Sequence, residues 1–97
     1  MRVLPELEAY RDRLMTKAAD WPDRPVEDLV AELGQCREQA RLLADSLLDL
    51  RSRGEGEGAD DAARRERRIT LQEQTRSITE AYAEALRRHL EGRAVRS

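Results

Sequence analysis

The feature that most constrains the fold is an apolar pattern that repeats every seven residues between positions 26 and 50. Apolar residues spaced alternately three and four positions apart lie on one side of an α-helix. The pattern therefore predicts a long helix, from about residue 25 to 53, with one side buried against a partner helix. The two heptad positions are occupied by Val26, Leu33, Ala40 and Leu47, and by Leu29, Cys36, Leu43 and Leu50.

A shorter helix is predicted before it, from about residue 5 to 20. Pro5 suits the first turn of a helix, where its missing N–H is not needed. Pro22 and Pro25 disfavour helical backbone in the residues that precede them, so they end this helix. Its predicted buried stripe consists of Val3, Leu7, Tyr10, Leu14, Ala18 and Trp21.

The third predicted helix runs from about residue 60 to 91, after a glycine- and glutamate-rich loop at 54–59. Three glycines within five residues favour a turn over a helix. We expect Gly92 to end the helix, because glycine is common just after a helix C-terminus. The predicted inner side consists of Leu71, Thr75, Ile78, Tyr82, Ala85 and His89, widened by Leu86 and Leu90.

The predicted fold is all-α: a long antiparallel helical hairpin, coiled-coil-like, with a short N-terminal helix, which makes three helices per chain. A short linker between two long helices makes them antiparallel neighbours, so we expect Leu50 near Ile69 and Val26 near Leu90. With 97 residues, of which 39% are charged, the chain has enough apolar side chains for a single domain, 1–97, with one thin core.

The second predicted helix has more apolar surface than one neighbouring helix can cover. A second stripe lies beside the heptad seam, while Leu42 lies away from it. Two interpretations are open: the N-terminal helix packs on this stripe, or part of the stripe meets another copy of the chain. Its residues are Val30, Gly34, Arg37, Arg41, Ala44 and Leu48.

This surplus of apolar surface is the basis of our functional expectation. A chain with so few large core residues gains stability from association. We expect a helix-mediated protein–protein interaction module, a small regulatory or adaptor protein that forms a homodimer or binds another helical protein. The predicted interaction residues are Val30, Gly34, Leu42, Ala44, Leu48, Ile69, Leu71 and Tyr82.

An alternative function is binding of a nucleotide or another phosphorylated ligand at an arginine-rich tip of the hairpin. Guanidinium groups and a helix N-terminus both favour phosphate. Five acidic residues within 51–68 reduce the net charge of this stretch to +1, which favours a self-neutralised tip. The candidate anion-binding residues are Arg51, Arg53, Arg64, Arg65, Arg67 and Arg68.

A third alternative is a small all-helical enzyme with an arginine-lined site. The segment REQARLLADSLLDLRSR, residues 37–53, resembles the first helix of the small all-helical chorismate mutases, with an Arg-Glu start, a leucine ladder and a later arginine. That family continues into a segment with a catalytic lysine, whereas this chain turns at Gly54, so the resemblance does not carry the activity over. No nucleophile–base pair is evident around His89 or Cys36, and we predict no catalytic residues.

Charge and cysteine content limit the classes of partner and the compartment that we expect for this chain. A pI near 5.5 is far from the basic character of most nucleic-acid-binding domains, so nucleic acid is not an expected partner. Cys36 is the only cysteine, and no apolar run approaches the length of a membrane span. We expect a cytoplasmic protein without a membrane segment, metal or cofactor.

Overall fold

The computed structural model describes residues 4–52 and 58–96. This part of the chain is built from α-helices joined by short connections, and it contains no β-strand. The prediction of an all-α fold is confirmed. The elements are α1 (Pro5–Ala19), the 3-10 helix η1 (Trp21–Asp23), α2 (Val26–Ser52) and α3 (Ala59–Arg96).

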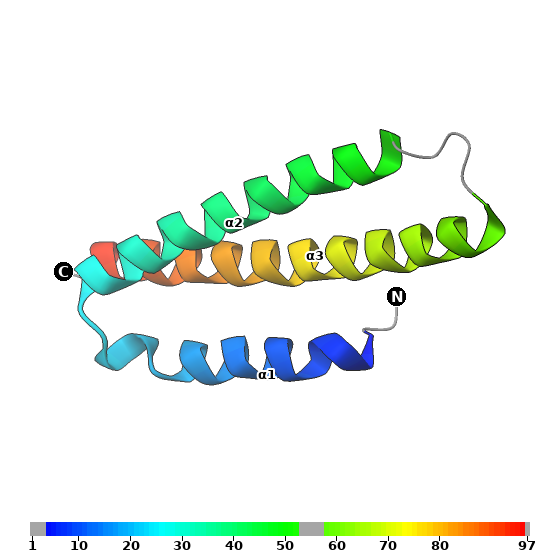
Figure 1. Cartoon of the computed structure of the whole chain (residues 1–97). Helices are drawn as coiled ribbons and strands as arrows, with labels where there is room; N and C mark the ends of the chain where they lie inside the picture. Colours follow the sequence, from blue (N-terminus) through cyan, green and yellow to red (C-terminus); the bar gives the residue numbers. More distant parts are fainter. Residues whose placement is uncertain (1–3, 53–57, 97) are drawn as a thin grey trace.

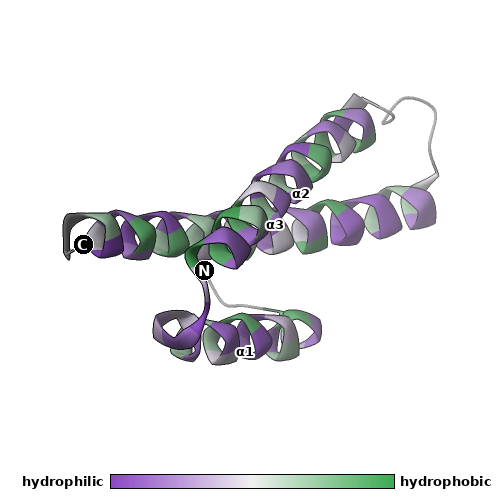
Figure 2. Cartoon of the chain, turned by 90° about the vertical axis from the view of Figure 1, so that its left-hand side faces the viewer, coloured by the Kyte–Doolittle hydropathy of each residue, from purple (hydrophilic) through white to green (hydrophobic). Residues whose placement is uncertain are grey.

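The two long helices α2 and α3 pack against each other and run in opposite directions, and their axes diverge toward the end of α2 (Figure 1). The predicted helical hairpin is therefore confirmed. The short helix α1 lies along α3, so that α3 is between α2 and α1 in the view of Figure 1. Colouring by hydropathy shows apolar and polar residues alternating along both long helices, as expected for helices with one buried side (Figure 2).

The chain turns between α1 and α2 where the two prolines lie. The N–H of Asp20 donates to the carbonyl of Lys17, and η1 then adds a single turn that contains Pro22. Arg24 has extended backbone, with φ −98° and ψ 144°, because the following proline disfavours the helical conformation. This sharp connection allows α1 to lie back along the hairpin.

The main hydrophobic core lies where all three helices meet. Leu29 on α2 and Leu86 on α3 are completely buried, and Trp21 from η1 is 7% exposed. The buried residues of this cluster come from each element, which ties α1 and η1 to the hairpin. They are Leu14, Trp21, Leu29, Leu33, Tyr82, Ala83 and Leu86.

A smaller apolar cluster lies toward the other end of the hairpin. It contains Leu47, Leu50 and Ile69, so the predicted proximity of Leu50 and Ile69 is confirmed. At the opposite end of α2, Val26 is 43% exposed, and the buried seam begins at Leu29.

Helix α3 continues through Gly92 to Arg96, so the prediction that Gly92 ends this helix is wrong. The last turns are held by Arg93, whose Nη1 donates to the carbonyl of Arg24 at 2.7 Å and to that of Trp21 at 3.4 Å. These hydrogen bonds fix the end of the helix to the turn before α2. Their stabilisation exceeds the small loss of helix stability that a glycine causes. Most of the predicted loop at 54–59 lies outside the described residues, and α3 begins at Ala59.

Helix α1 is fixed on α3 by hydrogen bonds between residues far apart in the sequence. The hydroxyl groups of Tyr10 and Thr79 lie 2.6 Å apart, and Thr79 is 1% exposed. The backbone N–H of Leu4 donates to Gln74 Oε1 at 2.7 Å. The interpretation that the N-terminal helix packs on the second stripe of α2 is therefore wrong, because α1 packs mainly on α3 and leaves Val30 and Leu48 exposed.

Candidate functional site

The most exposed apolar surface of the hairpin is the second stripe of α2, which we call the α2 stripe. It consists of Val30, Gly34, Arg37, Arg41, Ala44 and Leu48. Val30, near the start of α2, is 55% exposed, and Leu48, near its end, is 66% exposed. Since α1 packs on α3, no other helix in the part of the chain that the structure describes covers Val30 or Leu48.

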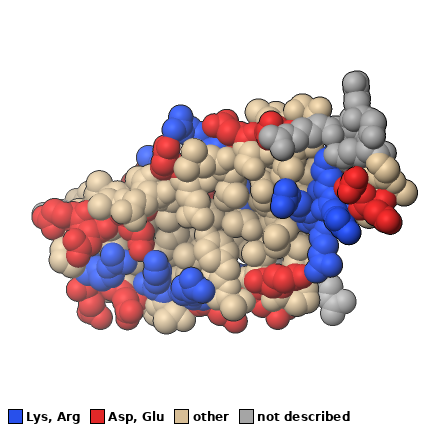
Figure 3. Space-filling model, viewed as in Figure 1, with Lys and Arg blue, Asp and Glu red and all other residues tan. Residues whose placement is uncertain are grey.

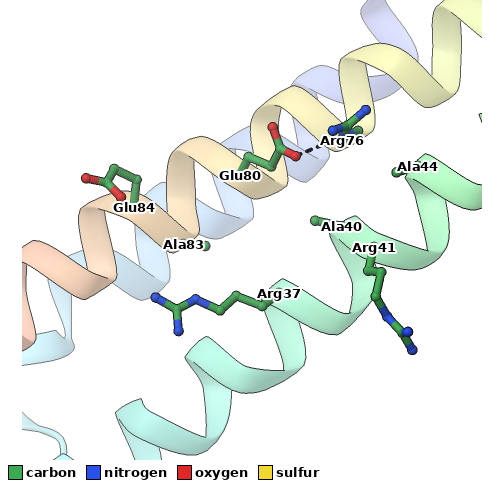
Figure 4. Close-up of a pocket in the computed structure, with 8 residues that line it drawn as sticks. All are labelled: Arg37, Ala40, Arg41, Ala44, Arg76, Glu80, Ala83 and Glu84. Carbon is green, nitrogen blue, oxygen red and sulfur yellow. Dashed lines mark hydrogen bonds and ion pairs between the residues drawn. The ribbon is translucent and has the colours of Figure 1, made fainter.

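A groove of about 450 Å³ runs beside this stripe, between α2 and α3 (Figure 4). The alanines in it leave room between the helices, while arginines and glutamates line its sides. Figure 4 shows that Arg37 extends into the space between the helices, whereas Arg41 points away from α3. The lining residues are Arg37, Ala40, Arg41, Ala44, Arg76, Glu80, Ala83 and Glu84.

The charged groups of this groove differ in their partners. Arg76 donates to Glu80 Oε1 at 2.9 Å, and Arg41 pairs with Glu38 at 2.6 Å. The hydrogen bond from Arg41 holds the pKa of Glu38 below its usual value. Within the described ranges, Arg37 has no ion pair, although it is the arginine that extends over the groove.

Gly34 is an exposed glycine in the middle of α2. A Cβ atom at this position would have no neighbouring atom within 4 Å, so the chain itself does not need a glycine there. A glycine inside a helix is about 1 kcal/mol less favourable than alanine. The small size of residue 34 therefore has no explanation within one chain.

Four of the predicted interaction residues lie outside the α2 stripe. Ile69 is 6% exposed and Tyr82 is 7% exposed, and both pack inside the chain, so they offer little surface to a partner. Leu71 is half-buried on α3. Leu42 is 55% exposed but lies about 120° around α2 from Leu48, at 3.6 residues per turn, and does not belong to the stripe.

Glu32, on α2, is the centre of a polar network that includes residues from several elements of the fold. Its Oε2 accepts hydrogen bonds from the Tyr82 hydroxyl at 2.6 Å and from Arg24 Nη1 at 3.2 Å. Its Oε1 lies 3.6 Å from Lys17 Nζ. Trp21 Nε1 donates to the Tyr82 hydroxyl at 3.2 Å, so the network joins every helix of the described chain.

The surroundings of Glu32 act on its pKa in opposite directions. Burial is the largest influence and favours the neutral acid, which raises the pKa. The hydrogen bonds from Tyr82 and Arg24, with the charges of Arg24 and Lys17, outweigh burial and hold the pKa of Glu32 below its usual value. For Tyr82, burial and the neighbouring carboxylate both raise the pKa of the hydroxyl, which therefore remains a hydrogen-bond donor. This network is suited to holding the helices together.

Two arginines of the predicted arginine-rich tip are paired with carboxylates on different helices. Arg51 pairs with Glu73 on α3, and Arg67 donates to Glu6 Oε1 on α1 at 2.8 Å. Arg53 lies outside the described residues. Figure 3 shows Lys and Arg side chains beside Asp and Glu at this end of the molecule. The remaining arginines of the tip, Arg64, Arg65 and Arg68, lie on the first turns of α3.

A second groove, of about 310 Å³, lies between α1 and α3. Met15, which is 65% exposed, lies at this groove, and the only charged lining residue is Arg11. Such a surface can accept an apolar side chain but offers no pair of polar groups that would orient a reacting molecule. The apolar lining is completed by Leu14, Ala18, Trp21, Ile78, Ala81, Tyr82 and Ala85.

The two remaining side chains that could carry chemistry, His89 and Cys36, are half-buried between the helices. The His89 ring stacks near Trp21, with ring centres 5.4 Å apart, and its buried Nε2 has no hydrogen-bond partner in the described chain. Burial raises the pKa of the Cys36 thiol, with the Glu32 charge adding to this effect. Across residues 4–52 and 58–96, no three His, Cys, Asp or Glu side chains are grouped as metal ligands.

Comparison with protein-family models, with curated proteins and with solved structures finds no match. Within the described chain, no helix combines the length and apolar character needed to cross a membrane.

Proposed function

We propose that this protein is a helix-mediated interaction module that forms a homodimer through the α2 stripe. The observation that carries the proposal is the exposure of Val30 and Leu48 on a long helix, on a side that no other element within residues 4–52 and 58–96 covers. A regulatory or adaptor role in the cytoplasm fits such a module, because proteins with these roles act by binding, and the α2 stripe is an exposed surface suited to binding.

The cost of leaving this surface exposed supports the proposal. Burying apolar area is worth about 25 cal/mol per Å², and a small three-helix chain has little stability in reserve. Single exposed apolar residues are ordinary on protein surfaces. Here, however, Val30 and Leu48 share one side of one helix with Ala44 and Gly34, which leaves a flat path for a second helix.

The alternative of a phosphorylated ligand at the arginine-rich tip has less support. Arg51 and Arg67 are engaged by carboxylates on different helices, and binding of phosphate would have to break those pairs. An enzyme with an arginine-lined site between α2 and α3 also has less support, because Arg41 and Arg76 already pair with glutamates there.

The solution mass tests the proposal. We expect light scattering to give twice the 11.1 kDa of one chain for the wild-type protein at micromolar concentration. Leu48→Glu places a charge in the apolar contact and should give a monomer with unchanged helix content by circular dichroism. Leu42→Glu is the matched control, because Leu42 is also exposed but lies on another side of α2, and it should remain a dimer. A wild-type monomer at high micromolar concentration would overturn the proposal.

A further inference from the structure

The order of residues along the α2 stripe is the same in both directions. Starting from the ends, an apolar residue is followed by a small residue and then by an arginine: Val30 corresponds to Leu48, Gly34 to Ala44 and Arg37 to Arg41. Each pair is centred on position 39. The stripe therefore has the symmetry that a two-fold axis through the middle of α2 would require.

We infer that two copies pair α2 against α2 in antiparallel orientation, with the two-fold axis at the level of residue 39. The inference rests on the proposed homodimer and specifies its partner surface and register. In this register Val30 of one protomer faces Leu48 of the other, and each apolar residue is covered by an apolar residue. A parallel in-register pair would instead place every residue opposite its own copy.

The small residues are also paired with one another in this register. Gly34 of one protomer faces Ala44 of the other, so two small residues meet on either side of the axis. Small residues at a helix crossing allow the backbones to approach closely. This contact gives a reason for a glycine at position 34, which has open space around it within its own chain.

The register places Arg37 of one protomer opposite Arg41 of the other, so the charges at the axis are alike and need acidic neighbours to balance them. Arg41 already has such a neighbour, because it pairs with Glu38. Asp45 lies one turn from Arg41 and is exposed. Arg37, which has no ion pair with any described residue of its own chain, can therefore reach acidic groups, Glu38 or Asp45, across the axis.

A charge exchange tests the register through the solution mass. Val30→Glu alone and Leu48→Lys alone each place a charge opposite an apolar residue, and both should weaken the dimer. The double variant Val30→Glu/Leu48→Lys places glutamate opposite lysine twice in the antiparallel register, and its dissociation constant should be at least about tenfold lower than that of either single variant. The control Val30→Glu/Leu48→Glu should remain monomeric.

Disulfide formation tests the same register without added charge. In a Cys36→Ser background, one protein carries Gly34→Cys and a second protein carries Ala44→Cys. The two proteins should form a mixed disulfide when they are combined. Either protein alone should not crosslink, because the cysteines of its two protomers are offset by ten residues, or about 15 Å along the helix, which is beyond disulfide reach.

The outcomes separate the two proposals. If the wild-type chain is a monomer, both the proposed function and the register fail. If the wild-type chain is a dimer, but the charge exchange gives no recovery and each cysteine variant crosslinks with itself, the dimer stands and the antiparallel register is overturned.

Discussion

The phenolic hydroxyl of Tyr82, on α3, lies 2.6 Å from Glu32 Oε2, on α2, and donates a hydrogen bond to it. The same hydroxyl accepts from Trp21 Nε1, while the tyrosine ring lies 5.3 Å from the tryptophan ring. One side chain thus joins the hairpin to the turn that follows α1. The polar network of Glu32 and the apolar core around Leu86 are parts of one structural unit, separate from the α2 stripe.

Tyr82→Phe should destabilise the chain while preserving its packing. The ring remains, but Glu32 loses a short hydrogen bond and Trp21 Nε1 loses its acceptor. A hydrogen bond to a charged group contributes about 1.5–3 kcal/mol, and we expect a loss of this order in the free energy of unfolding. Urea denaturation followed by circular dichroism measures it. A loss below about 0.5 kcal/mol, the range of ordinary surface substitutions, would show that the network is not structural.

The lowered pKa of Glu32 should make folding sensitive to acid. Its carboxylate is stabilised in the folded chain, so this contribution is present above the usual carboxyl pKa of 4.5 and is lost as the pH falls through the lower folded value. Other carboxylates contribute to acid sensitivity as well, including Glu84, whose hydrogen bond from Arg87 lowers its pKa to about 2.

Glu32→Gln isolates the contribution of this one group. The variant should be less stable than wild type at pH 7, and the difference between the two proteins should shrink as the pH falls below 4.5. Unfolding free energies of both proteins, measured by denaturant titration at each pH, give the comparison. A difference that stays constant over this range would mean that Glu32 keeps its usual pKa in the folded chain.

Leu86→Ala should be the more severe of two matched leucine truncations. Leu86 is completely buried, and removing a buried leucine side chain costs about 2–5 kcal/mol. Leu42→Ala removes the same atoms from a side chain that is 55% exposed and lies outside both the core and the α2 stripe. We expect it to change stability by less than about 0.5 kcal/mol. Similar melting temperatures for the two variants would contradict the assignment of the core.

The heptad pattern of residues 26–50 was enough to predict the hairpin. Leu29, Leu33 and Leu47 are buried as expected, because periodic apolar spacing determines which side of a helix loses contact with water. The two prolines likewise predicted the end of α1, since their effect on the backbone is local.

The position of α1 could not be predicted from periodicity. Its place on α3 depends on individual pairs such as Tyr10 with Thr79 and Trp21 with Tyr82, which are more than 60 residues apart in the sequence. For the same reason the sequence did not predict the hydrogen bonds that Glu32 accepts from Tyr82 and Arg24. A buried polar network leaves no periodic pattern in the sequence. The sequence shows only that residues able to form it, a glutamate, a lysine and a tryptophan, lie near a helix turn.

Gly34→Ala should have opposite effects on folding and on association. Within one chain, the added methyl group meets open space, and alanine is about 1 kcal/mol more favourable than glycine in a helix. In the Leu48→Glu background, which we expect to be monomeric, Gly34→Ala should therefore raise the free energy of unfolding by up to about this amount. In the otherwise wild-type chain, an added methyl in a packed contact is unfavourable by about 1–3 kcal/mol, so the dimer should weaken about tenfold or more.

Gly92→Ala is the matched control for this pair of effects. Gly92 is also an exposed glycine within a helix, with no atom within 4 Å of an added Cβ, but it lies on α3 away from the α2 stripe. Its substitution should stabilise the chain and leave the dissociation constant of the dimer unchanged. Sedimentation equilibrium of the two variants, beside their unfolding curves, measures both quantities. If Gly34→Ala stabilises the chain without weakening the dimer, the close approach of α2 to its copy at position 34 is refuted, because a contact between small residues there cannot accept a methyl group at no cost.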